Sequence, residues 1–250
     1  MDNAILIGLS RQSAMMRQMS VIANNIANMN TNGYKSASML FDEFVMPVAS
    51  EASPDKNLSF VQDFGQFRNV ADGAMQTTGN PLDVAISGEG FFKIQTPQGV
   101  RYTRDGHFQL DGSGQLVTQE GNPVLSDAGS PITFSADEGE ITIARDGTIT
   151  TSRPGTANSE QVRGKLGLTT FANLQDMKNE ENNLLSTTQT ETPVQSARIV
   201  QGSIEGSNVK PIVEMTNMMT VQRSYESAQK LIEAADDMRR QAISQIAAAA

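Results

Sequence analysis

The chain of 250 residues contains no cysteine and no tryptophan, and its only histidine is His107. Without cysteine it cannot form a disulfide, a thiolate zinc site or a thiol nucleophile. With one histidine it cannot form a multi-histidine metal site or a relay between two histidines. Since His107 stands beside Phe108 in a strand-like pattern, we interpret it as a structural residue.

A basic patch and a long hydrophobic run are also missing. The net charge of −9 argues against nucleic acid and anionic lipid as partners. No run reaches the length of a transmembrane helix, so we expect no membrane insertion. Polar residues interrupt the N-terminal apolar pattern at Arg11, Gln12, Arg17 and Gln18, which predicts that a Sec signal peptide is absent. Composition by itself is typical of a cytoplasmic protein.

No arrangement of residues suggests catalysis. The adjacent carboxylates of Asp42 and Glu43, and two similar pairs further on, would diverge on a helix or strand. Gly88 and Gly90 lack the third glycine and the helix of a dinucleotide fingerprint. We therefore predict that the protein is not an enzyme, with no catalytic, cofactor-binding or metal-binding residues and no cofactor.

The two ends of the chain are expected to be helical. Residues 4–29 carry an apolar stripe in alternating four- and three-residue steps, and residues 210–245 carry a second one that begins at Pro211, a good first helical residue. Both stripes have the spacing of a coiled-coil seam. Their members are Ile5, Leu9, Gln12, Met16, Met19, Ala23 and Ile26, and Met218, Val221, Tyr225, Ala228, Ile232, Ala235, Arg239 and Ala242.

Short strands separated by turn residues fill the middle of the chain. Turn signals every eight to twelve residues from Gly79 onward, with no helix between them, predict antiparallel β structure. We interpret Asp105-Gly106 and Asp146-Gly147 as hairpin turns. The predicted fold class is α+β, with a discontinuous helical coiled-coil domain (1–35 and 210–250), an extended connector (36–78) and a β-rich outer domain (79–209).

An asparagine-rich stretch, residues 23–35, ends the first predicted helix. Gly33 is the expected helix stop, because glycine readily takes positive φ. Five asparagines in nine residues exceed what capping requires. Uncharged amides can be buried against another backbone without the desolvation cost of a charge, so we expect neighbouring subunits to cover them.

Three blocks of sequence resemble the bacterial flagellar rod and hook proteins. The resemblance is carried by Ala23-Asn24-Asn25-Ile26-Ala27-Asn28 with Thr31, Gly33, Tyr34 and Lys35, by Gly79-Asn80-Pro81-Leu82-Asp83-Val84-Ala85-Ile86 with Gly88-Glu89-Gly90-Phe91-Phe92, and by Tyr102-Thr103-Arg104-Asp105-Gly106-His107-Phe108. These blocks cover roughly a third of the chain.

The resemblance implies a structural subunit of the proximal rod, which polymerises through its terminal helices and transmits torque in the periplasm. It also implies export by the flagellar type III apparatus without a cleaved signal, and partners that include other rod subunits, distal ones among them, and further copies of the chain. The alternatives are a distal-rod protein and a secreted β-sheet binding or adhesin domain. The predicted interface comprises Leu9, Met16, Met19, Ala23, Asn24, Asn25, Ile26, Asn28, Thr31, Gly33, Tyr34, Met218, Val221, Tyr225, Ala228, Ile232 and Ala235.

Overall fold

The structure is a computed structural model that describes residues 2–47, 57–135, 138–152, 160–194 and 197–249. These residues form two compact units, each assembled from separate parts of the chain. The helical unit comprises Met1–Ala27, Ala37–Asn69 and Lys210–Ala250, and the β unit comprises Asn28–Ser36 and Val70–Val209. The predicted class, α+β with mainly antiparallel strands, is confirmed.

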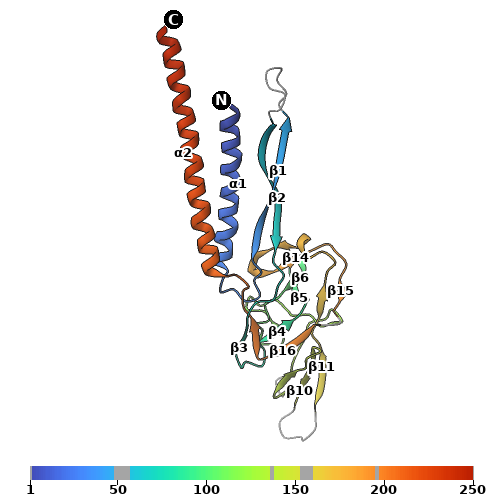
Figure 1. Cartoon of the computed structure of the whole chain (residues 1–250). Coiled ribbons are helices and arrows are strands. Elements are labelled where there is room, and N and C mark those ends of the chain that lie inside the picture. Colours follow the sequence, from blue (N-terminus) through green and yellow to red (C-terminus); the bar gives the residue numbers. More distant parts are fainter. Residues whose placement is uncertain (1, 48–56, 136–137, 153–159, 195–196, 250) are drawn as a thin grey trace. The chain divides into compact units, whose positions relative to one another are not determined.

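The helical unit consists of two helices and one hairpin. Helix α1 (Asp2–Ala27) contacts helix α2 (Pro211–Ala249) and also the hairpin of β1 (Ala37–Pro47) and β2 (Asn57–Arg68) (Figure 1). Pro211 is the first helical residue of α2, as predicted. Over the described residues, neither helix is long and apolar enough to cross a membrane.

The predicted connector, residues 36–78, differs from the observed structure. Its described residues include β1 and β2, which pair in antiparallel register from Ala37 opposite Arg68 to Pro47 opposite Asn57, with a register shift after Leu40. In an extended linker the backbone N–H and C=O groups would bond to water. In the observed hairpin they bond to each other across the two antiparallel strands. The observed unit boundaries therefore fall at 27/28, 36/37, 69/70 and 209/210.

The β unit is built on a six-stranded antiparallel sheet with several short ladders around it. The sheet has the order β13-β14-β6-β5-β12-β15, β10 lies between β9 and β11, and β7 pairs with β8. The strands are β3 (Met75–Thr77), β4 (Val84–Ser87), β5 (Phe91–Thr96), β6 (Gly99–Thr103), β7 (Gln109–Leu110), β8 (Leu116–Val117), β9 (Ile141–Ile143), β10 (Thr148–Thr151), β11 (Gln161–Lys165), β12 (Leu168–Thr170), β13 (Lys178–Asn179), β14 (Leu185–Ser186), β15 (Thr192–Pro193), β16 (Arg198–Gln201) and β17 (Ser203–Glu205). Two short 3₁₀ helices, Leu174–Asp176 and Glu181–Asn183, precede β13 and β14.

The last two strands of the β unit pair with two strands from near the start of its second segment, residues 70–209. Strand β16 pairs with β4, and β17 pairs with β3, so residues 198–205 lie beside residues 75–87. This closure by the end of the chain places the residues that precede α2 next to the first part of the unit.

A large apolar core holds the β unit together. Phe92 and Phe108 are fully buried and meet edge to face, with ring centroids 5.1 Å apart. Their cluster also contains Val84, Ile86, Ile94, Leu116, Val124, Ile132, Phe134, Ile143, Ile149, Leu166, Leu184 and Ile199. A second cluster contains Phe91, Tyr102, Phe171, Met177 and Leu185. Burial of side chains of this size supplies most of the stability of such a unit.

One of the two predicted Asp-Gly hairpins is wrong. Asp146-Gly147 does connect the paired strands β9 and β10. Asp105-Gly106 instead leads from β6 to β7, which belong to different ladders. The Gly106 carbonyl accepts a hydrogen bond from the Val84 N–H, and a Cβ on Gly106 would stand 1.7 Å from the Val84 carbonyl oxygen. Glycine is required there for a close backbone contact rather than for a turn.

Candidate functional site

The contact between α1 and α2 brings the two helices close together at Gly8. A Cβ on Gly8 would lie 2.8 Å from a side-chain carbon of Ile232, so the glycine permits close approach of the two helices. In the described part of the helical unit, the buried apolar side chains are Ala14, Val21, Ile22, Val221 and Ala228. Neither a leucine nor an aromatic ring is among them.

The predicted seam on α2 coincides with the covered face of that helix from Met218 to Ala235. Arg239 is exposed, and the side chain of Ala242 lies outside the described residues. Val221 and Ala228 are buried, and Met218, Tyr225, Ile232 and Ala235 are half-buried. The α2 seam is thus largely covered within a single chain.

The predicted seam on α1 is divided between covered and uncovered positions. Met19 and Ile26 are half-buried, whereas Ala23 and Asn24 are exposed. Leu9 and Met16 each expose 57% of their surface. The exposed members stay predicted interface residues.

Further large apolar side chains of both helices are exposed to solvent. Leu6 adds to the exposed stripe of α1, and α2 exposes Ile212, Val213, Met215, Met219, Leu231 and Met238. Large exposed apolar patches on soluble proteins mark sites of interaction with other proteins. The described helical unit therefore presents surface of the kind that a protein partner covers.

Asn25 has its partners within the same unit. Its Nδ2 donates to the Ala37 carbonyl at 2.8 Å, and the Ala37 N–H donates to its Oδ1 at 3.0 Å. Only 1% of Asn25 is exposed. The expectation that neighbouring subunits satisfy the amides is therefore wrong for Asn25, because its chain supplies both hydrogen bonds.

The nine residues Asn28–Ser36, here called the entry segment, belong to the β unit. Asn28 Oδ1 accepts a hydrogen bond from the Thr31 hydroxyl, Thr31 is half-buried, and Tyr34 is 7% exposed. Helix α1 ends at Ala27, six residues before Gly33, so the predicted role of Gly33 as the helix stop is wrong.

Gly33 has a different use in the entry segment. Its φ is +65°, its N–H donates to the Glu205 carbonyl at 2.7 Å, and a Cβ would lie 2.5 Å from the Arg104 carbonyl carbon. Gly33 thus allows the entry segment to lie flat against two other segments of the β unit. Burial of Gly33 and Tyr34 leaves little of either for a second subunit to contact.

The titratable groups that sequence analysis considered form no catalytic arrangement among the described residues. His107 Nδ1 lies 2.6 Å from Asp83 Oδ1, and Asn80 Nδ2 donates to the same oxygen. Burial raises the pKa of the nearby Asp105 carboxyl, against the opposing effect of the His107 backbone N–H. In the part of the chain that is described, no three His, Asp or Glu residues gather as metal ligands.

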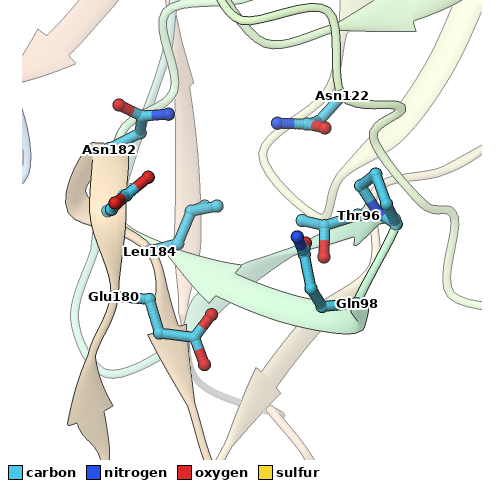
Figure 2. A pocket seen from close by; sticks show the side chains of 8 residues that line it. Thr96, Gln98, Asn122, Glu180, Asn182 and Leu184 are labelled. Carbon is cyan, nitrogen blue, oxygen red and sulfur yellow. The ribbon is translucent and has the colours of Figure 1, made fainter.

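A polar hollow of about 500 Å³ lies beside β6 and the second 3₁₀ helix (Figure 2). Its carboxylate Glu180 is engaged by Arg101, whose Nε donates at 2.5 Å, and this hydrogen bond lowers the pKa of Glu180. The lining residues are Thr96, Pro97, Gln98, Asn122, Glu180, Glu181, Asn182 and Leu184. The lining residues include no histidine, and the hydroxyl of Thr96 donates to the Gly99 carbonyl at 2.7 Å, so these residues form no pair of nucleophile and base.

Three family models match successive parts of the chain. Residues 5–35 match "Flagella basal body rod protein", residues 85–151 match "Flagellar hook protein FlgE/F/G D1 domain", and residues 200–246 match "Flagellar basal body rod FlgEFG protein C-terminal". The matches therefore include most of α1, much of the β unit and most of α2.

Curated relatives are similar over nearly the whole chain. The flagellar basal-body rod protein FlgF of Caulobacter vibrioides is 40% identical, with 98% of each chain covered. FlgF of Mesorhizobium japonicum is 32% identical over 93% of this chain and 92% of the relative. FlgG of Bacillus subtilis is 30% identical over 95% of this chain and 97% of the relative.

Proposed function

Because this chain belongs to the flagellar basal-body rod protein family, we propose that it is a subunit of the proximal rod, polymerising through its two terminal helices. The resemblance read from the three sequence blocks is thereby confirmed at the level of the family. Members of this family are structural proteins of the flagellar basal body and not enzymes, so this membership makes the chain a structural protein. The adhesin alternative is dropped.

The observation that carries the proposal is the uncovered apolar surface of the helical unit. Burying one large side chain contributes about 1.5–3 kcal/mol, and the described residues of α1 and α2 together expose nine such side chains, from Leu6 to Met238. In the proposed rod, helices of adjacent copies cover this surface as a coiled coil. A head-to-tail contact that does not close on itself then generates a helical filament.

The same proposal gives the protein its mechanical role. The assembled helices transmit torque within the periplasmic part of the flagellum, and the end of the filament offers a surface for the distal-rod subunit. Export of the chain by the flagellar type III apparatus is part of this proposal, supported by family membership. The distal-rod alternative stays open, since FlgG proteins are similar over nearly the whole chain too.

The proposal is tested by placing a charge on the exposed stripe of α1. In Leu9→Asp/Met16→Asp, we expect unchanged secondary structure in the monomer and loss of co-sedimentation with neighbouring rod subunits, because a carboxylate cannot be buried in an apolar contact. The matched control is Val162→Asp, which changes a 69%-exposed side chain on β11 of the β unit. Normal co-sedimentation of the α1 double variant would contradict assembly through the helices.

Complementation separates the two rod positions. We expect the chain to restore motility to cells that lack their proximal-rod subunit and not to cells that lack their distal-rod subunit. The reverse pattern would favour the distal-rod alternative.

A further inference from the structure

Four charged side chains meet inside the β unit at the place where the entry segment lies. Lys35 Nζ is 2.6 Å from Glu205 Oε1, and Arg104 lies 3.4 Å from Glu205 Oε2 through Nε and 2.7 Å from Asp72 Oδ1 through a terminal nitrogen. The side chains of Lys35, Arg104 and Glu205 are 6%, 4% and 0% exposed, and that of Asp72 is 41% exposed. Two cations and two anions balance, so the cluster has no net charge.

Glu205 is the centre of this cluster. One of its oxygens accepts two hydrogen bonds, one from the Lys35 ammonium and one from the Gly73 N–H at 2.8 Å. Its other oxygen has Arg104 as its charged neighbour and no hydrogen bond within the described residues. A carboxylate without solvent is stable only while such partners are in place.

Lys35 and Arg104 have further partners that fix their positions. The Lys35 ammonium also donates to the Ala71 carbonyl at 2.7 Å. Arg104 donates to the Gly88 carbonyl at 2.8 Å, and its guanidinium lies 5.8 Å from the centre of the Phe91 ring. Burial lowers the pKa of Lys35, with the Glu205 hydrogen bond acting in the opposite direction.

Backbone hydrogen bonds join the three stretches of chain that carry Lys35, Asp72 and Glu205. The Gly33 N–H donates to the Glu205 carbonyl, the Gly206 N–H donates to the Ala74 carbonyl, and the Asn208 N–H donates to the Tyr34 carbonyl. The stretches are the entry segment, residues 70–74 and residues 203–209. They contain every position at which the chain enters or leaves the β unit.

We propose that Lys35, Asp72, Arg104 and Glu205 form a charge clasp that docks the entry segment onto the β unit only when residues 203–209 are in place. The clasp joins residues 170 positions apart, Lys35 and Glu205, and does so through buried charges rather than apolar contact. Loss of one charge leaves the opposite charge buried and uncompensated, which disfavours the docked position strongly. The four are positioning residues, and this inference does not depend on the proposed rod function.

A consequence is that the first segment of the β unit depends on the last one for its stable position. In a chain in which residues 203–209 are displaced, the carboxylate left near Lys35 is the partly exposed Asp72, 4.0 Å away, and the Gly33 N–H loses its carbonyl acceptor. The entry segment then loses its buried ion pair and two backbone hydrogen bonds, which favours the undocked position even though the apolar core, centred on Phe92 and Phe108, is intact.

Hydrogen exchange on the full chain tests the clasp. In Glu205→Gln, which preserves side-chain size, we expect peptides covering residues 31–36 and 71–74 to exchange at least about 100-fold faster, with β5 unchanged. The matched control is Glu180→Gln, which removes the carboxylate of the Arg101 pair, whose side chains are 17% and 36% exposed. The control should leave the entry segment protected.

Two outcomes would overturn the proposal. One is wild-type protection of residues 31–36 in Glu205→Gln, and the other is equal acceleration of the entry segment and β5, which would make Glu205 a general stabiliser. If Glu205→Gln fails to fold, Asp72→Asn is the variant to test. Asp72 is partly exposed, so removing its charge should destabilise the protein less than removing that of Glu205. We expect Asp72→Asn to accelerate exchange of residues 31–36 about three- to tenfold, again without effect on β5.

A double-mutant cycle measures whether the charges act together. Lys35→Met and Glu205→Gln should each accelerate exchange of residues 71–74, and the double variant should exchange more slowly than the product of the two accelerations predicts. Accelerations that multiply would contradict a shared clasp.

Discussion

The β unit and the helical unit bury their apolar side chains to very different extents. The β unit encloses large residues such as Phe92, Phe108 and Leu116, each no more than 1% exposed. In the described helical unit the buried apolar side chains are alanine, valine and isoleucine, and Leu9 and Met16 are exposed. One unit thus completes its core within a single chain, whereas the other has apolar surface left over for partners. The proposed assembly would use the helical unit, because its exposed apolar side chains are the ones available to a partner.

The substitution with the largest expected effect on this difference is Gly106→Ala, which should destabilise the β unit. The new Cβ would meet the Val84 carbonyl oxygen at 1.7 Å, and backbone atoms on both sides cannot move without disrupting the core. We expect a loss of about 5 kcal/mol or more in the free energy of unfolding, enough to prevent the β unit from folding. Circular dichroism during urea unfolding measures it.

Gly112→Ala is the matched control for this prediction. A Cβ on Gly112 would meet nothing within 4 Å, and its φ is not positive. We expect its unfolding free energy to stay within about 0.5 kcal/mol of wild type. Similar losses in the two variants would argue against a specific close contact at Gly106.

Truncation of one apolar side chain in each unit sharpens the comparison. Phe92→Ala removes a fully buried ring in contact with Phe108 and should cost about 3–5 kcal/mol. Met16→Ala removes a side chain that is 57% exposed and should change monomer stability by less than about 0.5 kcal/mol. Thermal unfolding of the two purified variants compares them. Equal losses would mean that the exposed stripe of α1 is covered within the monomer.

The smallest expected loss from changing a buried group concerns a polar contact inside the helical unit. Asn25→Ala leaves the N–H and C=O of Ala37 without their observed partners, which should cost about 1–3 kcal/mol. Asn217→Ala, at an exposed position of α2, should be neutral or slightly stabilising because alanine favours helix. Urea unfolding monitored by circular dichroism at 222 nm checks both. An equal, small effect at the two positions would show that the Asn25 hydrogen bonds contribute nothing.

Periodicity in the sequence was sufficient to predict the helices and most of the β unit. Alternation of apolar residues around Val84, Phe92 and Tyr102 predicts strands, and the observed strands β4, β5 and β6 contain these residues, although β4 is buried on both faces. The seven-residue spacing along α2 likewise identified its covered face. Such patterns are local, so a single sequence contains them.

Contacts between distant parts of the chain could not be predicted in this way. In strand β17 the polar residues Ser203 and Glu205 are buried, and the apolar residue Ile204 is only half-buried. Hydrophobicity alone would predict the opposite, with Ile204 facing the interior. No local signal indicates that Lys35 is the partner of Glu205. The β1–β2 hairpin was missed because its residues do not alternate clearly and were interpreted as connector.

The two hydrogen bonds between Asn25 and Ala37 also define a load path. Between these residues the chain leaves the helical unit for the nine residues of the entry segment and then returns. The two hydrogen bonds connect the end of α1 directly to the start of β1, in addition to the other contacts between the helix and the hairpin. A pull on the hairpin can therefore be carried to α1 without first stretching the nine residues of the entry segment.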